Sequence, residues 1–252
     1  MNGSKVDAVV ANWFPRFLAN GIDYFDLHRT LDAVDGWDTW AGAWTDTADE
    51  YERLGEQAMA VGHRVTAAEH LRRAALTLQF AQFVLTEEPE LRASLQARMA
   101  RTYARCAPLL NPPAVRTSVA YGAGRTVVGY LRVPVGRGLR GLVVLVPGLE
   151  STKEQFSTYE PFFLHRGVAT LSVEGPGQGE GGKGMPFRDT AYSDAMRAVG
   201  AAISELEGVD PSRVVVLGTS FGGYLALRHA ALIPGLRGVV DVAGPYDLQA
   251  FE

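Results

Sequence analysis

The segment RVVVLGTSFGGYLALR, residues 213–228, decides the fold. It combines a short apolar run, a glycine-rich turn around Ser220 and the start of a helix. A strand, the pattern Gly-x-Ser-x-Gly and a helix follow one another in this order at a nucleophile elbow, a tight turn that lifts a serine hydroxyl out at the end of a sheet. The helix N-terminus behind the turn favours a developing oxyanion. The alternative interpretation is a glycine-rich turn with an incidental serine.

The pattern around this segment alternates between strands and helices. Runs that are apolar on both faces are typical of parallel strands covered by helices on both sides. Such runs occupy residues 141–146, 168–173, 213–217 and 238–242, with helix-like segments over 153–165, 190–207 and 221–233. Two strand-like stretches, 115–121 and 126–133, come first and predict an antiparallel hairpin. We therefore expect an α/β fold with a mostly parallel sheet.

The first part of the chain has a different character. Upstream of Asn111-Pro112-Pro113 the patterning is helical, and the two prolines end it. Thr47 and Glu50, for example, have the spacing of a capping box and predict that a helix begins there. We predict an all-helical domain over residues 1–112 and an α/β domain over residues 113–252.

The composition excludes several classes of protein. Of the 252 residues 47% are hydrophobic, as in soluble globular proteins, and 24 Lys and Arg against 28 Asp and Glu give a net charge of −4. No basic run is long enough to follow a phosphate backbone, so we expect no nucleic-acid partner. The apolar runs are shorter than the roughly 20 residues of a membrane helix. With one cysteine, Cys106, and no signal-like apolar stretch near Met1, the sequence predicts a cytoplasmic protein without a membrane partner.

The sequence predicts neither a metal nor a cofactor. His63 and His70 are spaced to share a helix face, but no third ligand is near enough in sequence to suggest a metal site. The glycines of residues 174–180, EGPGQGE, resemble a dinucleotide loop. Pro176 and the absence of a helix start at the right offset argue against one, and a turn near the rim of a pocket is the better interpretation.

Three tryptophans in the helical domain allow two interpretations. Trp37, Trp40 and Trp44 follow one another at helical spacing. Such rings offer rigid apolar area, so they either line a pocket or pack the helical domain against its neighbour. Exposed aromatic side chains on this domain also allow a homodimer.

The loop VPGLES, residues 146–151, follows the first strand after the hairpin. In folds with a nucleophile elbow this loop supplies the second N–H group of the oxyanion hole. We predict that the N–H of Leu149 is this second donor and that the N–H of Phe221, directly after Ser220, is the first.

These motifs together resemble the α/β-hydrolase superfamily. The resemblance rests on Val-Pro-Gly, Glu-Gly-Pro-Gly-Gln-Gly and Gly-Thr-Ser-Phe-Gly-Gly at these separations and covers residues 115–252. The preceding helical domain and the loop PGLESTKE, residues 147–154, make the chain similar to the branch that contains 2,6-dihydropseudooxynicotine hydrolase and the fungal hydrolases that shorten polyketide pigment precursors. The resemblance implies cleavage of a carbon–carbon bond next to a ketone, a helical domain that caps the active site, and an active-site glutamate that corresponds to Glu150.

Glu150 is also notable for its chemistry. A carboxylate beside an oxyanion hole opposes negative charge unless it is protonated or hydrogen-bonded. Burial under a cap would raise the pKa of Glu150 and make it a proton donor or a group that orients substrate or water. The alternative is a solvated residue before the helix that begins at Lys153.

The base and the acid of a serine hydrolase follow the serine in the order Ser, then Asp or Glu, then His. The only histidine after Ser220, His229, lies about two and a half helical turns further on and is misplaced. Asp247 is either the acid or a turn residue after Pro245. We therefore expect the histidine to lie beyond residue 252, in a longer hydrolase, and the 252-residue chain to have an open sheet edge and almost no activity.

The sequence thus predicts a serine-nucleophile hydrolase that acts on a small molecule, most simply a β-dicarbonyl or polyketide-like ketone. A carboxylesterase, an acyltransferase or a cyclase would use the same acyl-enzyme. A hydrolase-like fold that serves as a binding module without catalysis is the remaining alternative.

Overall fold

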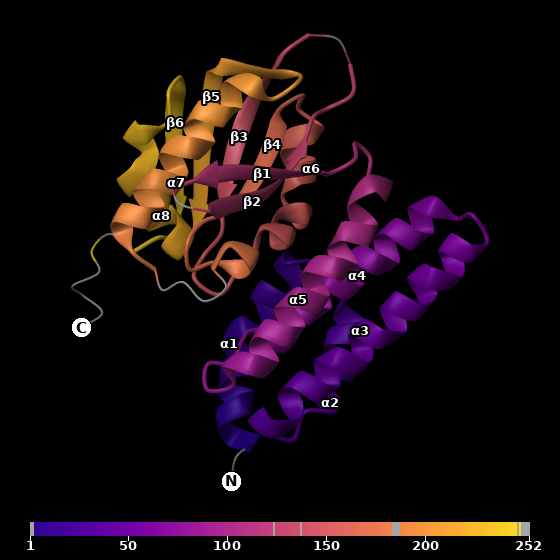
Figure 1. Ribbon diagram of the computed structural model, residues 1–252. Helices are drawn as coiled ribbons and strands as arrows, with labels where there is room; N and C mark the ends of the chain where they lie inside the picture. Colours follow the sequence, from indigo (N-terminus) through magenta and orange to yellow (C-terminus); the bar gives the residue numbers. More distant parts are fainter. Residues whose placement is uncertain (1–2, 123, 137, 183–186, 246, 248–252) are drawn as a thin grey trace. The chain divides into compact units, whose positions relative to one another are not determined.

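The boundary between two compact units, Met1–Leu110 and Asn111–Glu252, falls just before the paired prolines. In this computed structural model the described residues are 3–122, 124–136, 138–182, 187–245 and 247 (Figure 1). Each unit has its own secondary structure, helical in the first and mixed in the second.

Helices build the first unit. They are α1 (Gly3–Ala19), α2 (Tyr24–Asp32), α3 (Trp37–Ala60), α4 (Arg64–Gln82) and α5 (Pro89–Cys106), followed by the 3₁₀ turn η1 (Ala107–Leu109). The predicted helix start at Thr47 is wrong, because α3 already begins at Trp37. The hydroxyl of Thr47 instead lies 2.7 Å from that of Thr30 on α2, a buried contact between helices that spacing alone does not reveal. No helix within the described ranges has the length and apolar composition to cross a membrane.

The tryptophans of α3 belong to the core of the helical unit. Trp40 and Trp44 are fully buried, and their rings lie 6.2 and 5.3 Å from that of Phe17. Trp40 Nε1 donates a hydrogen bond of 2.9 Å to the carbonyl of Phe80. The interpretation that these two rings line a pocket is therefore wrong. Trp37, at the start of the helix, is 37% exposed.

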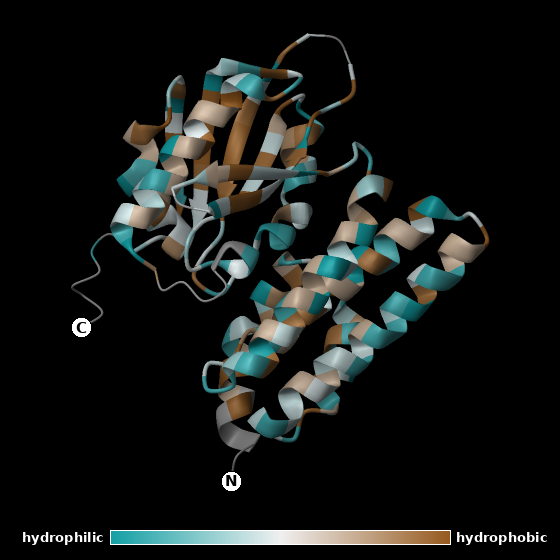
Figure 2. Ribbon diagram, in the orientation of Figure 1, coloured by the Kyte–Doolittle hydropathy of each residue, from teal (hydrophilic) through white to brown (hydrophobic). Residues whose placement is uncertain are grey.

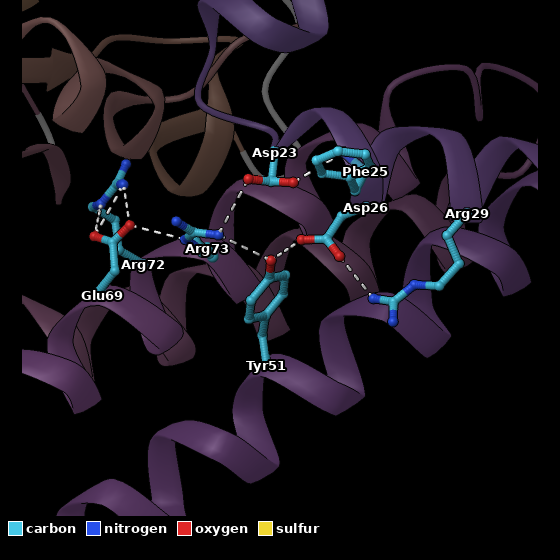
Figure 3. Close-up of polar contacts among 8 residues, drawn as sticks. All are labelled: Asp23, Phe25, Asp26, Arg29, Tyr51, Glu69, Arg72 and Arg73. Carbon is cyan, nitrogen blue, oxygen red and sulfur yellow. Dashed lines mark hydrogen bonds and ion pairs between the residues drawn. The ribbon is translucent and has the colours of Figure 1, made fainter.

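A polar network joins α2, α3 and α4 (Figure 3). The hydroxyl of Tyr51 donates to Asp26, which also accepts a hydrogen bond of 2.9 Å from Arg29. Arg73 donates to the Tyr51 oxygen at 3.2 Å and to Glu69 at 2.9 Å. Burial and the neighbouring Asp26 raise the pKa of Tyr51 to about 12, so its hydroxyl keeps the proton that it donates.

The second unit contains a six-stranded mixed sheet (Figure 1). The strands are β1 (Val115–Tyr121), β2 (Arg125–Arg132), β3 (Arg140–Val146), β4 (Ala169–Glu174), β5 (Val209–Thr219) and β6 (Leu236–Val242). Their order is β1-β2-β4-β3-β5-β6. The first two pairs are antiparallel and the other three are parallel. This arrangement confirms the predicted hairpin and the predicted mostly parallel sheet.

The central strands are apolar on both faces because helices cover both, and β3 is mostly brown in Figure 2. Alternate residues of β3, such as Leu142 and Val144, pack with α7 (Asp189–Ala202) and α8 (Phe221–His229). The residues between them, Val143 and Leu145, pack with Phe156 and its neighbours. Phe156 belongs to the 3₁₀ helix η2 (Lys153–Thr158), which precedes α6 (Glu160–Leu164).

In two of the segments that differ from the prediction, a proline lies at the point of difference. The single helix predicted over 153–165 is divided into η2 and α6, because Pro161 starts a new helix in its first turn. The residues Asp210, Pro211 and Ser212, predicted to precede a strand, lie within β5. The register of β5 against β3 shifts there, since a proline has no N–H to donate to a sheet.

A buried ion pair fixes the start of the second unit. Arg132 Nη1 lies 2.9 Å from a carboxylate oxygen of Glu160, and both side chains are almost completely buried. Nε and Nη2 of Arg132 donate to the carbonyl of Pro112 at 3.1 and 2.9 Å. Burial raises the pKa of Glu160 while the guanidinium of Arg132 opposes that rise. One side chain thus joins β2, α6 and the segment before β1.

We expect Arg132→Met to lower the free energy of unfolding by about 3–5 kcal/mol, because it leaves the carboxylate of Glu160 buried without a counter-charge. Urea unfolding followed by circular dichroism measures this loss. Arg197→Met is the matched control, since Arg197 pairs with Asp194 on the surface and such pairs contribute about 0–1 kcal/mol. Equal losses in the two variants would contradict the prediction.

Candidate active site

Ser220 lies at the turn between β5 and α8, with φ 54° and ψ −130°. A positive φ is costly for a residue with a side chain, about 1–3 kcal/mol, and persists where the surroundings enforce it. Two backbone hydrogen bonds do so here: Ser220 N donates to Val242 O at 2.8 Å, and Gly223 N donates to Ser220 O at 2.7 Å. The serine is exposed, and its side chain makes no capping hydrogen bond to α8. Its hydroxyl is therefore available for chemistry.

Two glycines leave room for this turn. A Cβ on Gly218 would lie 1.9 Å from the carbonyl oxygen of Gly222, far inside contact distance. A Cβ on Gly148 would lie 3.2 Å from the Cβ of Ser220 and 3.6 Å from its Oγ. The loop after β3 thus runs directly against the serine, where a second oxyanion donor is needed.

The two predicted donors directly follow the two residues of this contact in sequence. Phe221 is the first residue of α8, and the first N–H groups of a helix have no partner within it. Leu149 follows Gly148 in the loop, and its side chain is 55% exposed. Among the described residues no hydrogen bond uses the N–H of Leu149. Both N–H groups remain predictions as donors to an oxyanion.

The other two predicted site residues are Glu150 and Asp247. Glu150 is half-buried in the same loop, next to Leu149. Asp247 is exposed, five positions after β6 ends at Val242. The roles of Glu150 as a proton donor and of Asp247 as the acid stay predictions.

His229 has other partners, as its position along α8 suggested. Its buried ring lies 2.9 Å, through Nδ1, from the carbonyl of Leu225 and 3.3 Å, through Nε2, from a carboxylate oxygen of Asp189 on α7. In the described part of the second unit, neither His229 nor His165 forms a hydrogen bond with Ser220. These residues therefore provide no base for the serine.

A buried charged cluster next to the loop after β3 was not predicted from the sequence. Lys153 Nζ is fully buried and lies 2.6 Å from Glu154, 3.0 Å from Glu174 and 2.7 Å from Glu180. Burial alone would lower the pKa of Lys153, but these carboxylates raise it well above its ordinary range. The ammonium group is therefore permanently charged and holds three acidic side chains together.

Glu174 joins two loops within this cluster. One of its carboxylate oxygens accepts from the backbone N–H of Lys153 at 3.0 Å, in the segment after β3. The other accepts from the N–H of Glu180 at 2.9 Å, in the loop after β4. Burial raises the pKa of Glu174 to about 7, although Lys153 opposes the rise.

Gln178, in the same loop after β4, contacts the loop after β3 directly. Its side chain is 3% exposed. Its Nε2 donates to the carbonyl of Pro147 at 2.6 Å and lies 3.4 Å from that of Gly148. For the EGPGQGE segment that contains Gln178, the sequence alone predicts only a turn near the rim of a pocket.

Comparison with known proteins assigns this arrangement to a family. The model of the FrsA-like esterases matches residues 26–246, most of the chain. The chain belongs to this family. Its α/β-hydrolase fold, with a helical N-terminal region before a mostly parallel sheet, is that of its structural relatives.

Relatives of this FrsA-like protein include bacterial and fungal hydrolases. It is 36% identical over 250 residues to the 2,6-dihydropseudooxynicotine hydrolase of Paenarthrobacter nicotinovorans, across 98% of this chain and 66% of the relative. It is 30% identical to the 20-hydroxy-prefusarin hydrolase FUS2 of Gibberella moniliformis, across 84% and 53%. The crystal structure of the 2,6-dihydroxy-pseudo-oxynicotine hydrolase matches with a TM-score of 0.80 and 37% identity, across 88% of this chain and 62% of that one. The chain thus spans between half and two thirds of these relatives, and the predicted resemblance is confirmed.

The raised pKa of Glu174 predicts a pH-dependent stability. A carboxyl whose pKa rises on folding binds its proton more tightly when folded, so its contribution is full below its ordinary pKa of 4.5 and is lost as the pH rises through about 7. Glu174→Gln does not titrate. We expect the free energy of unfolding of the wild type, minus that of this variant, to fall as the pH rises across that range.

Urea unfolding at a series of pH values measures this difference. The same change at the exposed Glu205 controls for the loss of one negative charge. A difference for Glu174→Gln that stays constant from pH 4.5 to pH 7 would show that its carboxyl titrates alike in the folded and unfolded states.

Proposed function

We propose that this FrsA-like protein is a serine-nucleophile hydrolase that cleaves a carbon–carbon bond next to a ketone in a β-dicarbonyl or polyketide-like small molecule. The observation that carries the proposal is Ser220, exposed, strained at φ 54° and touched by the loop of Gly148. Membership of a hydrolase family supports the reaction class. The branch that the loop motifs resemble supports the choice of bond.

In this reaction the Ser220 hydroxyl gives its proton to a general base as its oxygen attacks the ketone carbon, and the electron pair of the carbonyl bond moves onto the carbonyl oxygen. The N–H groups of Phe221 and Leu149 donate to that oxyanion. When the oxyanion collapses, the neighbouring carbon–carbon bond breaks and the leaving carbon departs with the electron pair, as an enolate. Glu150 is the proposed proton donor to this carbanion. Water then hydrolyses the acyl-enzyme and restores the serine.

Ester hydrolysis is the second candidate. The family is described by its esterases, and an ester carbonyl meets the same nucleophile and the same oxyanion donors. The two reactions differ in the group that leaves, which is an alkoxide for an ester and a carbanion for a ketone. The role of the helical unit as a cap also remains a prediction from the resemblance.

The first test is covalent labelling of Ser220. A fluorophosphonate probe reacts with an activated serine, so we expect it to label the full-length protein and to leave Ser220→Ala unlabelled. Ser212→Ala, an exposed serine of the same strand, is the control and keeps full labelling. Mass spectrometry of the labelled peptide identifies the site. A wild-type protein that takes up no probe would favour a binding module instead.

The second part of the test decides the bond. The full-length protein is given a β-diketone and a p-nitrophenyl ester, and product formation is followed by absorbance. We expect turnover of the diketone, lost in Ser220→Ala. Fast hydrolysis of the ester with no cleavage of the diketone would refute carbon–carbon cleavage and leave the esterase.

A further inference from the structure

Gly148 makes the backbone flexible next to the proposed nucleophile. Its close approach to Ser220 leaves little room for a side chain, since a Cβ would lie 3.2 Å from both the Cβ of Ser220 and the carbonyl oxygen of Thr219. Glycine has the least restricted backbone of all residues, so the peptide between Gly148 and Leu149 is free to rotate unless something holds it. A rotated peptide would present a carbonyl oxygen where a donor is required.

The side chain of Gln178 holds this peptide by its carbonyl end. Its Nε2 reaches the carbonyl oxygens of Pro147 and Gly148, at 2.6 and 3.4 Å. Its Oε1 accepts from the backbone N–H of Gly175 at 3.1 Å and from the hydroxyl of Tyr192 at 3.3 Å. Carbonyls only accept and a backbone N–H only donates, so these partners leave one possible orientation of the amide.

The orientation of the carbonyls sets that of the N–H groups. In a trans peptide the C=O and the N–H point in opposite directions. Because the Gly148 carbonyl is turned toward Gln178, the N–H of Leu149 is turned away from Gln178. That N–H has no acceptor among the described residues, so it is available to a ligand.

Gln178 is itself held from two sides. Its backbone N–H donates to the carbonyl of Gly175 at 3.1 Å and closes a turn. Glu174 lies at the start of the loop that contains Gln178, and its carboxylate accepts from the N–H of Glu180 further along this loop. The same carboxylate also accepts from Lys153 Nζ. The buried amide therefore has a fixed position from which to act on the neighbouring loop.

We propose that Gln178 is a positioning residue of the oxyanion hole: it holds the Gly148–Leu149 peptide with its N–H directed to the substrate oxygen. This inference rests on the proposed function of Ser220. Gln178 touches no reacting atom, and its loss affects the transition state, in which the oxyanion forms, more than the binding of the ground state.

The test measures kcat and KM of Gln178→Met in the full-length protein, with the concentration of active enzyme determined by fluorophosphonate titration. We expect kcat to fall about 10- to 100-fold, somewhat less than the 10²–10³-fold loss of removing an oxyanion donor outright, and KM to change less than about threefold. Gln178→Asn keeps the amide but is one methylene too short to reach both carbonyls. It should show the same loss, and it serves where the methionine variant does not fold.

A transition-state analogue provides a readout that a merely structural role would not change. A trifluoromethyl ketone forms an oxyanion adduct with the serine, so its inhibition constant should rise by the same factor by which kcat/KM falls. Tyr192→Phe is the matched control, because it removes one of the two donors to Oε1 and leaves the N–H of Gly175 and both contacts of Nε2 in place. It should keep kcat within about threefold, a loss of one weak hydrogen bond.

The outcomes separate this inference from the proposed function. Unlabelled wild-type protein would refute the nucleophilic Ser220 and the inference with it. Normal turnover by the wild type together with an unchanged kcat, per active site, in both Gln178 variants would overturn the inference alone. An unchanged inhibition constant in those variants would do the same.

Discussion

The turn from β5 into α8 is too crowded for side chains, and the rest of the proposed active site depends on this constraint. Gly218 lies so close to Gly222 that any added carbon would collide with its carbonyl. The serine between them is left with a left-handed backbone conformation, held by β6 and by the first turn of α8. Crowding also extends to the facing loop, where a Cβ on Gly148 would lie 3.2 Å from that of Ser220, so a glycine is favoured at this position. Because a glycine leaves this loop flexible, neighbouring side chains must fix its orientation.

Buried charged side chains help to fix the loops around Ser220, and burying them costs free energy. Taking an ammonium and several carboxylates out of water is expensive, and the attraction between them offsets this only where the geometry is good. Lys153 contacts all three of its acidic neighbours within 3.0 Å, and Glu174 accepts backbone N–H groups from two separate loops. The cluster therefore links the segment after β3 to the loop after β4 through buried charged groups.

The sequence predicted what is encoded locally. Apolar runs of strand length, the glycines around Ser220 and the prolines after Leu110 act within a few positions, so the sheet and the turn followed from them. Thr47 misled because its partner, Thr30, lies 17 positions away on another helix. The contacts of Gln178 with Pro147 and of Glu174 with Lys153 join residues 31 and 21 positions apart. No local pattern distinguishes such a glutamine or glutamate from one exposed to solvent, and only the folded chain reveals it.

The contacts of Arg132 have a consequence for dissecting the protein. Its guanidinium donates twice to the carbonyl of Pro112, so the segment before β1 serves as a structural part of the sheet unit. A version of that unit expressed alone and started at Pro113 would leave two buried N–H donors without an acceptor, which costs about 1–3 kcal/mol for each such group. Starting at Asn111 keeps the acceptor in place. The N-terminal boundary of this structural unit therefore lies a few residues before its first strand.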